Sequence, residues 1–200
     1  NPDLAICIGA DMREIAQRRY KWDDIGNAYF ELLASDKWIA IGANKKTWER
    51  FKVKIEMKIT ETKLVGVKIL KPTRFSDNRG FFAEIYNRRV FEDLGIDVDF
   101  VQENHSLSSE VGTVRGLHFQ SPPHAQAKLV RCGRGAIFDV VVDIRQDSPT
   151  YGMWIGQELS AENGTQLFIS AGFAHGFVTL EPDSEIIYMC SNYYAPEAEV

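Results

Sequence analysis

The 200-residue chain is 44% hydrophobic and 12% aromatic, a composition that favours a folded core over disorder. Its net charge of −5 disfavours nucleic acid as a partner, because a polyanion is bound by a basic face. No apolar run approaches the roughly 18 residues of a membrane span, and no signal peptide is visible, so we expect a cytoplasmic protein. Cys7, Cys132 and Cys190 are too far apart to predict a disulfide framework or a structural zinc site.

Residues 1–56 predict a short helical segment in front of the main domain. The stretch "DDIGNAYFELLA" places Ile25, Tyr29 and Leu32 at helical spacing. Asp23, which precedes them, is a residue type that caps helices.

Residues 57–200 have a sequence pattern that is typical of a β-domain. From Lys63 onward, short runs of β-branched and aromatic residues alternate with Gly, Pro, Asn and Asp. The strand candidates are "KLVGVKIL", "GFFAEIYN", "VDFVQENHS", "TVRGLHFQ", "AKLVRCG", "AIFDVVVDIR", "MWIGQEL", "QLFISAG", "HGFVTLE" and "EIIYMCS". One helical insert is expected near "RRVFEDLG". This pattern predicts a mostly β, antiparallel sandwich or barrel rather than a βαβ fold.

Three polar residues with chemical capacity lie on two neighbouring strand candidates. Arg115 and His118 belong to "TVRGLHFQ" and Lys128 to "AKLVRCG", so a hairpin through "SPPHAQ" would bring them to one face. Arg115 and His118 have an odd separation and would point to opposite faces of a regular strand, unless Gly116 permits a bulge. The alternative is an ordinary core histidine and a solvated lysine.

Two further residues suit a pocket wall. His175 lies between the glycines of "SAGFAHGFVTLE", and Tyr188 lies among apolar residues in "EIIYMCSNYY". The alternatives are an exposed loop histidine and a core or interface tyrosine. Metal-binding barrels of this kind pair two histidines one residue apart, whereas His118 is followed by Phe119 and Gln120, so we expect no metal site.

Another polar cluster lies in "FSDNRGFFAEIYN" and "VQENHS". These segments contain Asp77, Arg79, Glu84, Gln102, Asn104 and His105. Taken singly, such residues are typical of turns and strand edges.

These motifs together with "ISAGFAHGFVTL" and "YYAPEAE" resemble the dTDP-4-dehydrorhamnose 3,5-epimerase family, whose fold is the cupin jelly roll. The resemblance covers about Met57 to Val200. It implies inversion of C3 and C5 of dTDP-4-dehydro-6-deoxy-D-glucose without a metal or other cofactor. His118 would be the general base, Tyr188 the general acid and Lys128 the cation near the keto oxygen.

The resemblance also implies how the substrate is held. The nucleotide-sugar contacts would be Arg79, Glu84, Gln102, Asn104, Arg115, His175 and Glu199, with Asp139 behind them. A homodimer is implied, in which the partner subunit supplies part of each pocket. The arginines would let an acidic domain bind a diphosphate.

The chain departs from the family pattern in two respects. The family pairs its base with an aspartate that follows the "YYAPEAE" region, and these 200 residues do not include it, so we expect a C-terminally truncated domain with a weaker base. Residues 1–56 have no counterpart in the family, and "REIAQRRYKWDDIGNAYFELL" resembles the terminal helices of GT-B glycosyltransferases. A fusion or a frame artefact would explain that segment.

Two alternatives to double epimerisation follow from the same residues. One is an enzyme that epimerises only C3 or only C5, because such enzymes differ in how the sugar ring is placed. The other is a non-catalytic jelly roll that binds nucleotide sugars.

Overall fold

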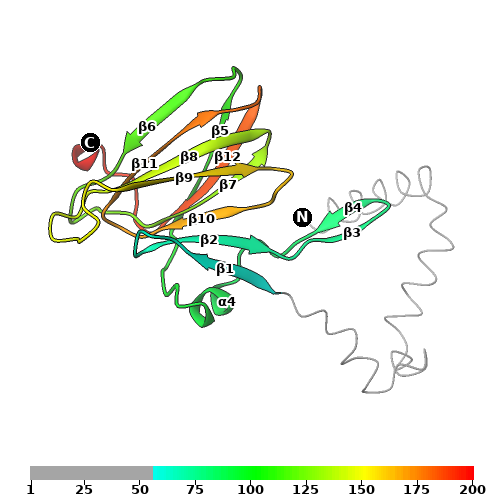
Figure 1. Ribbon diagram of the computed structural model, residues 1–200, viewed down its shortest axis with the longest axis horizontal. Helices are drawn as coiled ribbons and strands as arrows, with labels where there is room; N and C mark the ends of the chain where they lie inside the picture. The colour runs from blue at the N-terminus through cyan, green and yellow to red at the C-terminus, as the bar shows by residue number, and fades with distance from the viewer. Residues whose placement is uncertain (1–55) are drawn as a thin grey trace, which may run out of the picture. The chain divides into compact units, whose positions relative to one another are not determined.

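The structure is a computed structural model that describes residues 56–200, which form an antiparallel β-sandwich of two sheets (Figure 1). They belong to the second of two units of the chain, Ile55–Val200. Residues 1–55, where the helical segment is expected, lie outside the described part of the chain. No helix in the described part is long and apolar enough to cross a membrane.

Six strands form one sheet and four form the other. The six-stranded sheet contains, in spatial order, β1 (Met57–Glu61), β2 (Val67–Pro72), β10 (Gln166–Ile169), β7 (Lys128–Arg134), β12 (Ser184–Cys190) and β5 (Gln102–Ser108). The four-stranded sheet contains β6 (Val114–His118), β11 (Phe173–Thr179), β8 (Ala136–Asp143) and β9 (Trp154–Ser160).

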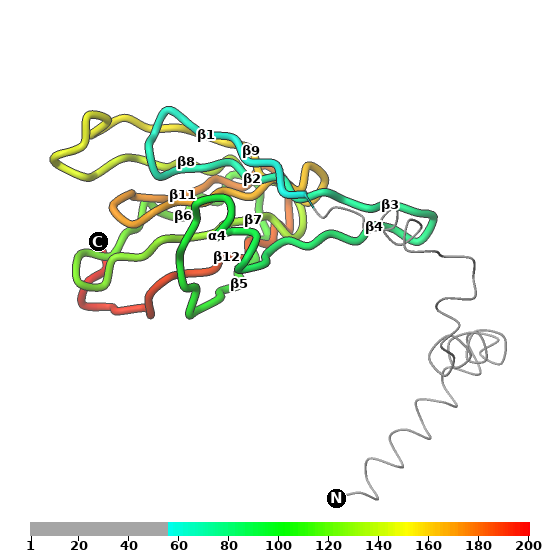
Figure 2. Tube along the Cα trace, turned by 90° about the horizontal axis from the view of Figure 1, so that it is seen from below, coloured from blue at the N-terminus to red at the C-terminus, as the bar shows by residue number. Residues whose placement is uncertain are grey.

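The remaining elements lie outside the two sheets. β3 (Phe75–Asp77) and β4 (Gly80–Phe82) form a separate hairpin, which extends away from the sandwich in Figure 1 and in the rotated view of Figure 2. The helix α4 (Arg88–Asp93) follows the hairpin, and a 3-10 turn, η2 (Pro196–Ala198), lies near the C-terminus. The C-terminus and the hairpin lie at opposite ends of the sandwich in both views.

The path of the chain is that of a jelly roll. From β5 to β12 each connection crosses to the other sheet, except the one between β8 and β9, which are neighbours. Strands close in sequence therefore face one another across the core instead of pairing. This arrangement confirms the predicted cupin-type jelly roll.

The space between the sheets is filled by the inward side chains of both. Along β8, Ile137, Asp139, Val141 and Asp143 share the inward register and are fully buried. Burial of each large aliphatic side chain contributes about 1.5–3 kcal/mol. The two aspartates in this register lack that gain, so each must be held by polar partners.

A second apolar cluster lies between α4 and the six-stranded sheet. Asn87 caps the helix, because its side chain accepts a hydrogen bond of 3.1 Å from the backbone N–H of Arg89. The helix buries Phe91, which packs with Leu129 and Phe168. The predicted helical insert is therefore confirmed.

The strand predictions largely agree with the structure. Each of the predicted segments contains a strand, but β1 and β3 were not predicted. β1 consists of intermediate and exposed residues without the apolar run used as the signal. β3 is only three residues long, and its polar residues are of the types that are typical of turns.

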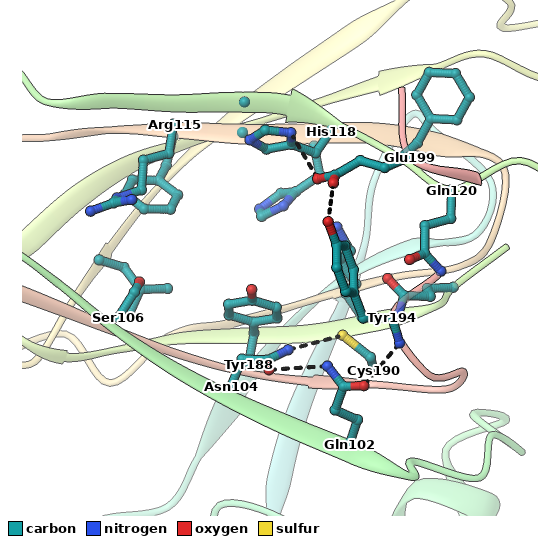
Figure 3. A pocket seen from close by; sticks show the side chains of 18 of the residues that line it. Gln102, Asn104, Ser106, Arg115, His118, Gln120, Tyr188, Cys190, Tyr194 and Glu199 are labelled. Atoms are coloured by element: carbon teal, nitrogen blue, oxygen red, sulfur yellow. Dashed lines mark hydrogen bonds and ion pairs between the residues drawn. The ribbon is translucent and has the colours of Figure 1, made fainter. Parts of the chain in front are cut away.

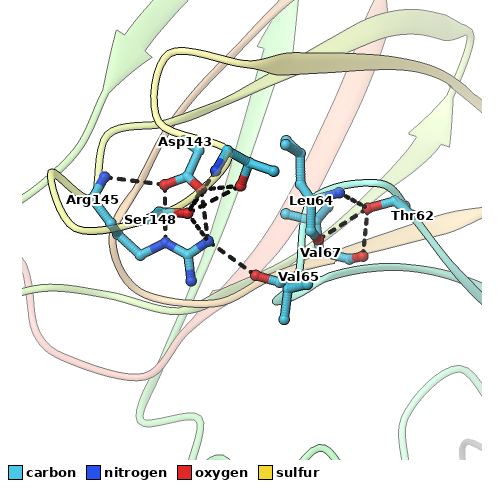
Figure 4. A network of polar contacts seen from close by, with 8 residues as sticks. Thr62, Leu64, Val65, Val67, Asp143, Arg145 and Ser148 are labelled. Atoms are coloured by element: carbon cyan, nitrogen blue, oxygen red, sulfur yellow. Dashed lines mark hydrogen bonds and ion pairs between the residues drawn. The ribbon is translucent and has the colours of Figure 1, made fainter.

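A polar network fixes the loop after β8 (Figure 4). Asp143 accepts hydrogen bonds from Arg145 Nε at 2.9 Å, Ser148 Oγ at 2.6 Å and Thr150 Oγ1 at 2.6 Å. Arg145 also donates to the backbone oxygen of Val65 at 3.1 Å. The arginine beside it holds the pKa of Asp143 well below its usual range. The network thereby ties the β8–β9 loop to the β1–β2 loop.

Candidate active site

A cavity of about 520 Å³ opens between the two sheets, and side chains of both line it (Figure 3). Arg115 and His118 reach it from β6 of the four-stranded sheet, whereas Lys128 and Tyr188 reach it from β7 and β12 of the other. In Figure 3, His118 and Tyr188 lie on facing walls of this space. The residues that the sequence singled out for proton transfer therefore share one cavity.

The predicted route to this arrangement was wrong. β6 and β7 were expected to pair as a hairpin, but β6 pairs with β11, and β7 lies between β10 and β12 in the other sheet. Arg115 and His118 consequently face Lys128 across the core instead of lying beside it. The connecting "SPPHAQ" segment crosses between the sheets because both apolar faces must be buried against each other.

Gly116 resolves the odd separation of Arg115 and His118. On β11, Phe177 pairs with Arg115 and His175 with His118, so β6 has one extra residue between these pairs. Gly116 has φ +102°, which favours glycine, and a Cβ there would lie 2.6 Å from Gly176 Cα. The predicted bulge is confirmed.

Burial shifts the acidity of two of the polar groups in the cavity. It lowers the pKa of the Lys128 ammonium and raises the pKa of the Tyr188 phenol. Nearby Cys190 and Asp139 oppose the shift at Lys128 without cancelling it. The phenol consequently keeps its proton at neutral pH, as a proton donor must.

His175 forms part of the cavity wall and is only 8% exposed. Its Nε2 lies 2.8 Å from Oδ2 of Asp139, which is fully buried behind it on β8. Burial raises the pKa of Asp139, and the nearby His175 and Lys128 oppose that rise. His175 is therefore a buried strand residue, and the exposed-loop alternative is wrong.

The polar residues on the floor of the cavity bind one another. Gln102 donates to Asn104 Oδ1 at 3.0 Å, and Asn104 Nδ2 lies 3.8 Å from the sulfur of Cys190. On the facing wall, Arg115 donates to Ser108 Oγ at 3.0 Å. Arg115 also lines the cavity.

Two residues expected at the substrate do not line this cavity. Arg79 lies at the turn of the β3–β4 hairpin, where it pairs with Asp77 at 2.5 Å and is 84% exposed. Glu84 follows the hairpin and accepts a hydrogen bond of 3.1 Å from Asn87. Only Arg79 is carried on the projecting hairpin, and neither residue belongs to the cavity lining of this chain.

Sequence reasoning assigned no role to Gln120 and Tyr194, although both line the cavity. Gln120 is 8% exposed and accepts a hydrogen bond of 2.8 Å from the backbone N–H of Ala195. Tyr194 donates its hydroxyl hydrogen bond to Glu199, whose other carboxylate oxygen lies 3.6 Å from Nδ1 of His118. The motif "YYAPEAE" contained the signal for Tyr194, but its partner depends on the folded chain.

A jelly roll with an imidazole, an ammonium and a phenol around one cavity defines a cupin-type protein equipped for proton transfer. The chain belongs to the dTDP-4-dehydrorhamnose 3,5-epimerase family, because the sequence profile of that family matches residues 61–200. The relatives from Salmonella, Bacillus and Legionella are named as epimerases, which are isomerases.

Relatives from three bacteria illustrate the similarity. The dTDP-4-dehydrorhamnose 3,5-epimerase of Salmonella typhimurium is 54% identical over 144 residues, which cover 72% of this chain and 78% of that protein. A Bacillus anthracis epimerase structure with TDP and pyrophosphate bound has a TM-score of 0.71 at 50% identity, covering 72% of this chain and 82% of that one. A Legionella pneumophila structure in complex with dTDP-4-keto-L-rhamnose has a TM-score of 0.69 at 46% identity, covering 72% and 76%.

Proposed function

We propose that this chain epimerises C3 and C5 of dTDP-4-dehydro-6-deoxy-D-glucose and so forms dTDP-4-dehydro-L-rhamnose. The observation that carries the proposal is that His118 and Tyr188 face one cavity from opposite sheets, with Lys128 beside it, in a chain of this family. The Legionella relative binds the product of that reaction in its structure, which supports the same ligand class here.

The chemistry begins at the C4 ketone, which acidifies the hydrogens on C3 and C5. An imidazole has a reference pKa of about 6.5 and can accept such a proton near neutral pH. His118 is the proposed base. The electron pair left on carbon moves onto the ketone oxygen as an enolate, and the Lys128 ammonium is the proposed cation near that oxygen.

Inversion requires that the proton return from the other side of the ring. Tyr188 lies on the wall that faces His118, and burial favours its protonated form. It is the proposed donor to the carbon, after which the enolate collapses to the ketone. One proton leaves and one returns at each centre, so the reaction needs no oxidant or other cofactor.

Binding of the nucleotide sugar is assigned to the other polar residues. Arg115, His175, Gln102, Asn104 and Glu199 line the cavity and are proposed to hold the substrate, with Asp139 supporting His175. The diphosphate would pair with the guanidinium of Arg115. A cytoplasmic location for this reaction stays a prediction.

Arg79 and Glu84 require a second subunit to reach a substrate. We propose a homodimer in which the β3–β4 hairpin enters the partner's cavity, because the hairpin projects from the sandwich and carries Phe81 and Phe82 at 58% and 64% exposure. Apolar side chains as exposed as these are typical of a protein–protein interface.

The reaction is tested by incubating the purified chain with the keto sugar in D2O and following it by NMR. Deuterium at both C3 and C5 with formation of the L-rhamno product is expected, and His118→Ala abolishes both. Deuterium at one carbon would indicate a single epimerase. Binding of dTDP without any exchange in the wild-type chain would indicate a binding module and would contradict the proposal.

The exchanged hairpin is tested by mixing two inactive variants. If the hairpin serves the partner's cavity, a mixed dimer of His118→Ala and Arg79→Ala subunits contains one cavity with both defects and one with neither. We expect activity to return in the mixture, up to about a quarter of the wild-type rate for random pairing of equal amounts. If each hairpin serves its own subunit, every cavity keeps one defect and no activity returns.

A further inference from the structure

Arg74 joins the start of the β3–β4 hairpin to the turn between β9 and β10. Its Nη1 donates a hydrogen bond of 2.6 Å to the backbone oxygen of Glu162, and its Nη2 donates one of 2.6 Å to that of Ala161. The planar guanidinium presents its donors in a fixed fork, which suits two carbonyl groups of consecutive residues. Because Arg74 directly precedes β3, these bonds fix the point from which the hairpin leaves the sandwich.

The same guanidinium also contacts the second strand of the hairpin. Arg74 Cζ lies 4.2 Å above the centre of the Phe81 ring in β4, which is the geometry of a cation–π contact. Phe81 is two residues from Arg79, which lies in the turn of the hairpin. Arg74 therefore holds both strands at the root of the segment that carries Arg79.

A second anchor holds the chain where it leaves the hairpin. Gln166, which is buried at the start of β10, donates from Nε2 to the backbone oxygen of Ile85 at 2.8 Å. Its Oε1 is buried without a hydrogen-bond partner among the described residues, which costs stability. Both ends of the hairpin are thus attached to the short stretch of residues 161–166.

Between these anchors the root of the hairpin is not packed against the sheet. A cavity of about 390 Å³ lies there, and its lining includes Phe81, Phe82 and Ile85 as well as Arg131 and Gln166. Close packing normally fixes how one element lies on another. Here the orientation of the hairpin depends on the polar anchors instead.

The turn that receives Arg74 is itself held rigidly. The side-chain oxygen of Asn163 accepts hydrogen bonds from the backbone N–H of Ser160 at 3.2 Å and of Thr165 at 2.8 Å. Gly164 has φ +62°, and a Cβ there would lie 2.6 Å from Cζ, Nε and Nη2 of Arg74. The glycine therefore leaves the room that the guanidinium occupies.

We infer that Arg74 is a positioning residue for Arg79, because it fixes the direction in which the hairpin projects (Figure 1). This inference rests on the proposed function, in which the hairpin enters the partner's cavity. A two-stranded hairpin is only marginally stable by itself, so its direction must be fixed at its root. A misplacement of about 1 Å far from the reacting atoms can cost about 10²-fold in activity.

Arg74→Ala tests the role by kinetics. The variant removes the contacts at the root but leaves the residues of the hairpin unchanged, so Arg79 occupies its place at the substrate for less of the time. Loss of such binding raises KM and leaves kcat unchanged. We expect KM to rise on the order of tenfold, with kcat within about twofold of the wild type. An unchanged KM, or a lower kcat at unchanged KM, would overturn the inference.

Mixed dimers show in which cavity Arg74 acts. With His118→Ala in excess, nearly every Arg74→Ala subunit pairs with a subunit that has an intact hairpin but an inactive cavity. All activity then comes from the cavity of Arg74→Ala, which receives the intact hairpin, and we expect KM to return to the wild-type value. A KM that stays raised would mean that Arg74 acts on the cavity of its own chain, which contradicts the inference.

Gly164→Ala disturbs the same contact from the other side. The new Cβ displaces the guanidinium, so KM should rise as in Arg74→Ala, and the double variant should show no further rise because the shortened side chain leaves the space free. Gly152→Ala is the matched control, since Gly152 has φ +74° and nothing within 4 Å of the added Cβ, and its KM should be unchanged. Additive effects, or an equal rise in the control, would contradict the role. If Gly164→Ala melts early, Arg74→Ala decides, because it leaves the backbone of the turn unchanged.

The mixture of His118→Ala and Arg79→Ala separates this inference from the proposed function. If that mixture regains no activity, the exchange of hairpins is wrong, and the role of Arg74 is wrong with it. If the mixture regains activity while Arg74→Ala keeps the wild-type KM, only the positioning role is wrong.

Discussion

In the wall of the cavity, Oδ2 of Asp139 lies 2.8 Å from Nε2 of His175, with exposures of 0% and 8% for the two residues. The other carboxylate oxygen, Oδ1, is buried and has no hydrogen-bond partner among the described residues. A half-satisfied buried carboxylate is costly for stability, and such costs are typical of functional sites. The buried carboxylate therefore lowers the free energy of unfolding, but it fixes the orientation of His175.

Replacement of Asp139 tests this relationship. Burial raises the folded pKa of Asp139, so its stabilising contribution is complete only below the unfolded pKa of about 3.9 and is lost as the pH rises through the folded value. We expect Asp139→Asn to unfold at a higher temperature at pH 7, because its free energy of unfolding is larger by about 1 kcal/mol, and the difference to shrink towards pH 4. Calorimetry at both pH values measures this.

The same variant should be a poorer enzyme, because His175 loses its charged partner. A lower melting temperature at pH 7, or unchanged kcat/KM, would contradict the account of the pair. Val140→Ala, a neighbour on β8 that is not in the inward register, is a matched control for effects of mutating this strand.

Tyr188→Phe should uncouple proton exchange from inversion. The variant keeps the ring but cannot return a proton from its face, whereas His118 can still remove one and give it back. We expect deuterium to enter the sugar while product formation falls by about 10²–10⁴-fold. NMR of the recovered sugar measures both quantities.

Tyr193→Phe is the matched control for Tyr188→Phe. Tyr193→Phe removes a hydroxyl from a residue that is 66% exposed and outside the cavity lining, and it should behave as the wild type. Product formation at the wild-type rate in Tyr188→Phe would exclude Tyr188 as the acid.

On the alkaline side, the activity should begin to decline at a lower pH than the pKa of an ordinary lysine. Burial lowers the folded pKa of Lys128, so the ammonium loses its proton before the pH reaches the free-lysine value of about 10.4. The charge is complete below the lowered value and is lost as the pH rises through it. We expect kcat to fall on the alkaline side accordingly, and a pH profile of kcat measures the decline.

Lys128→Arg provides the comparison, because a guanidinium stays charged over this range. Its kcat will be lower if the geometry is poorer, but its profile should lack the same alkaline decline. An identical decline in both proteins would assign the titration to another group.

Asp143→Asn should destabilise the fold rather than the site. Its neighbours lower its folded pKa, so its contribution is complete above the unfolded pKa of about 3.9 and is lost as the pH falls through the folded value. We expect a loss of about 2–3 kcal/mol at pH 7, because the variant breaks hydrogen bonds to Arg145, Ser148 and Thr150. Denaturant unfolding at pH 7 and in strong acid measures this loss and its decrease.

Asp147→Asn is the control for this loop. Asp147 is exposed, and no hydrogen bond or ion pair joins its side chain to a described residue, so its replacement should leave stability within about 0.5 kcal/mol. Equal losses in the two variants would mean that the polar network contributes little.

Much of the β-domain could be predicted from local sequence. The alternation in β8 specifies that Ile137 and Val141 point inward, because successive strand residues face opposite sides of a sheet. Glycine, proline, asparagine and aspartate mark the turns, because these residue types suit the backbone conformations that turns require. Gly116 even indicated the bulge that lets Arg115 and His118 face the same cavity.

Strand partners depended on the tertiary structure. Closeness in sequence predicted that β6 pairs with β7, yet the two strands belong to different sheets. Two sheets that bury their apolar faces against each other gain more than a local hairpin can, and this gain depends on the whole set of strands. A local sequence pattern therefore cannot predict which strands pair.

The surroundings of the proposed base show the same division. The sequence by itself determined that the chain contains His118, Lys128 and Tyr188, whose side chains suit proton transfer, and that these residues lie on strands. Only the tertiary structure decided that His118 has the carboxylate of Glu199 beside it, through the bridge between Gln120 and Glu199. The physical reason is that periodicity fixes the face to which a side chain points, whereas its neighbours are fixed by long-range packing and pairing of the chain.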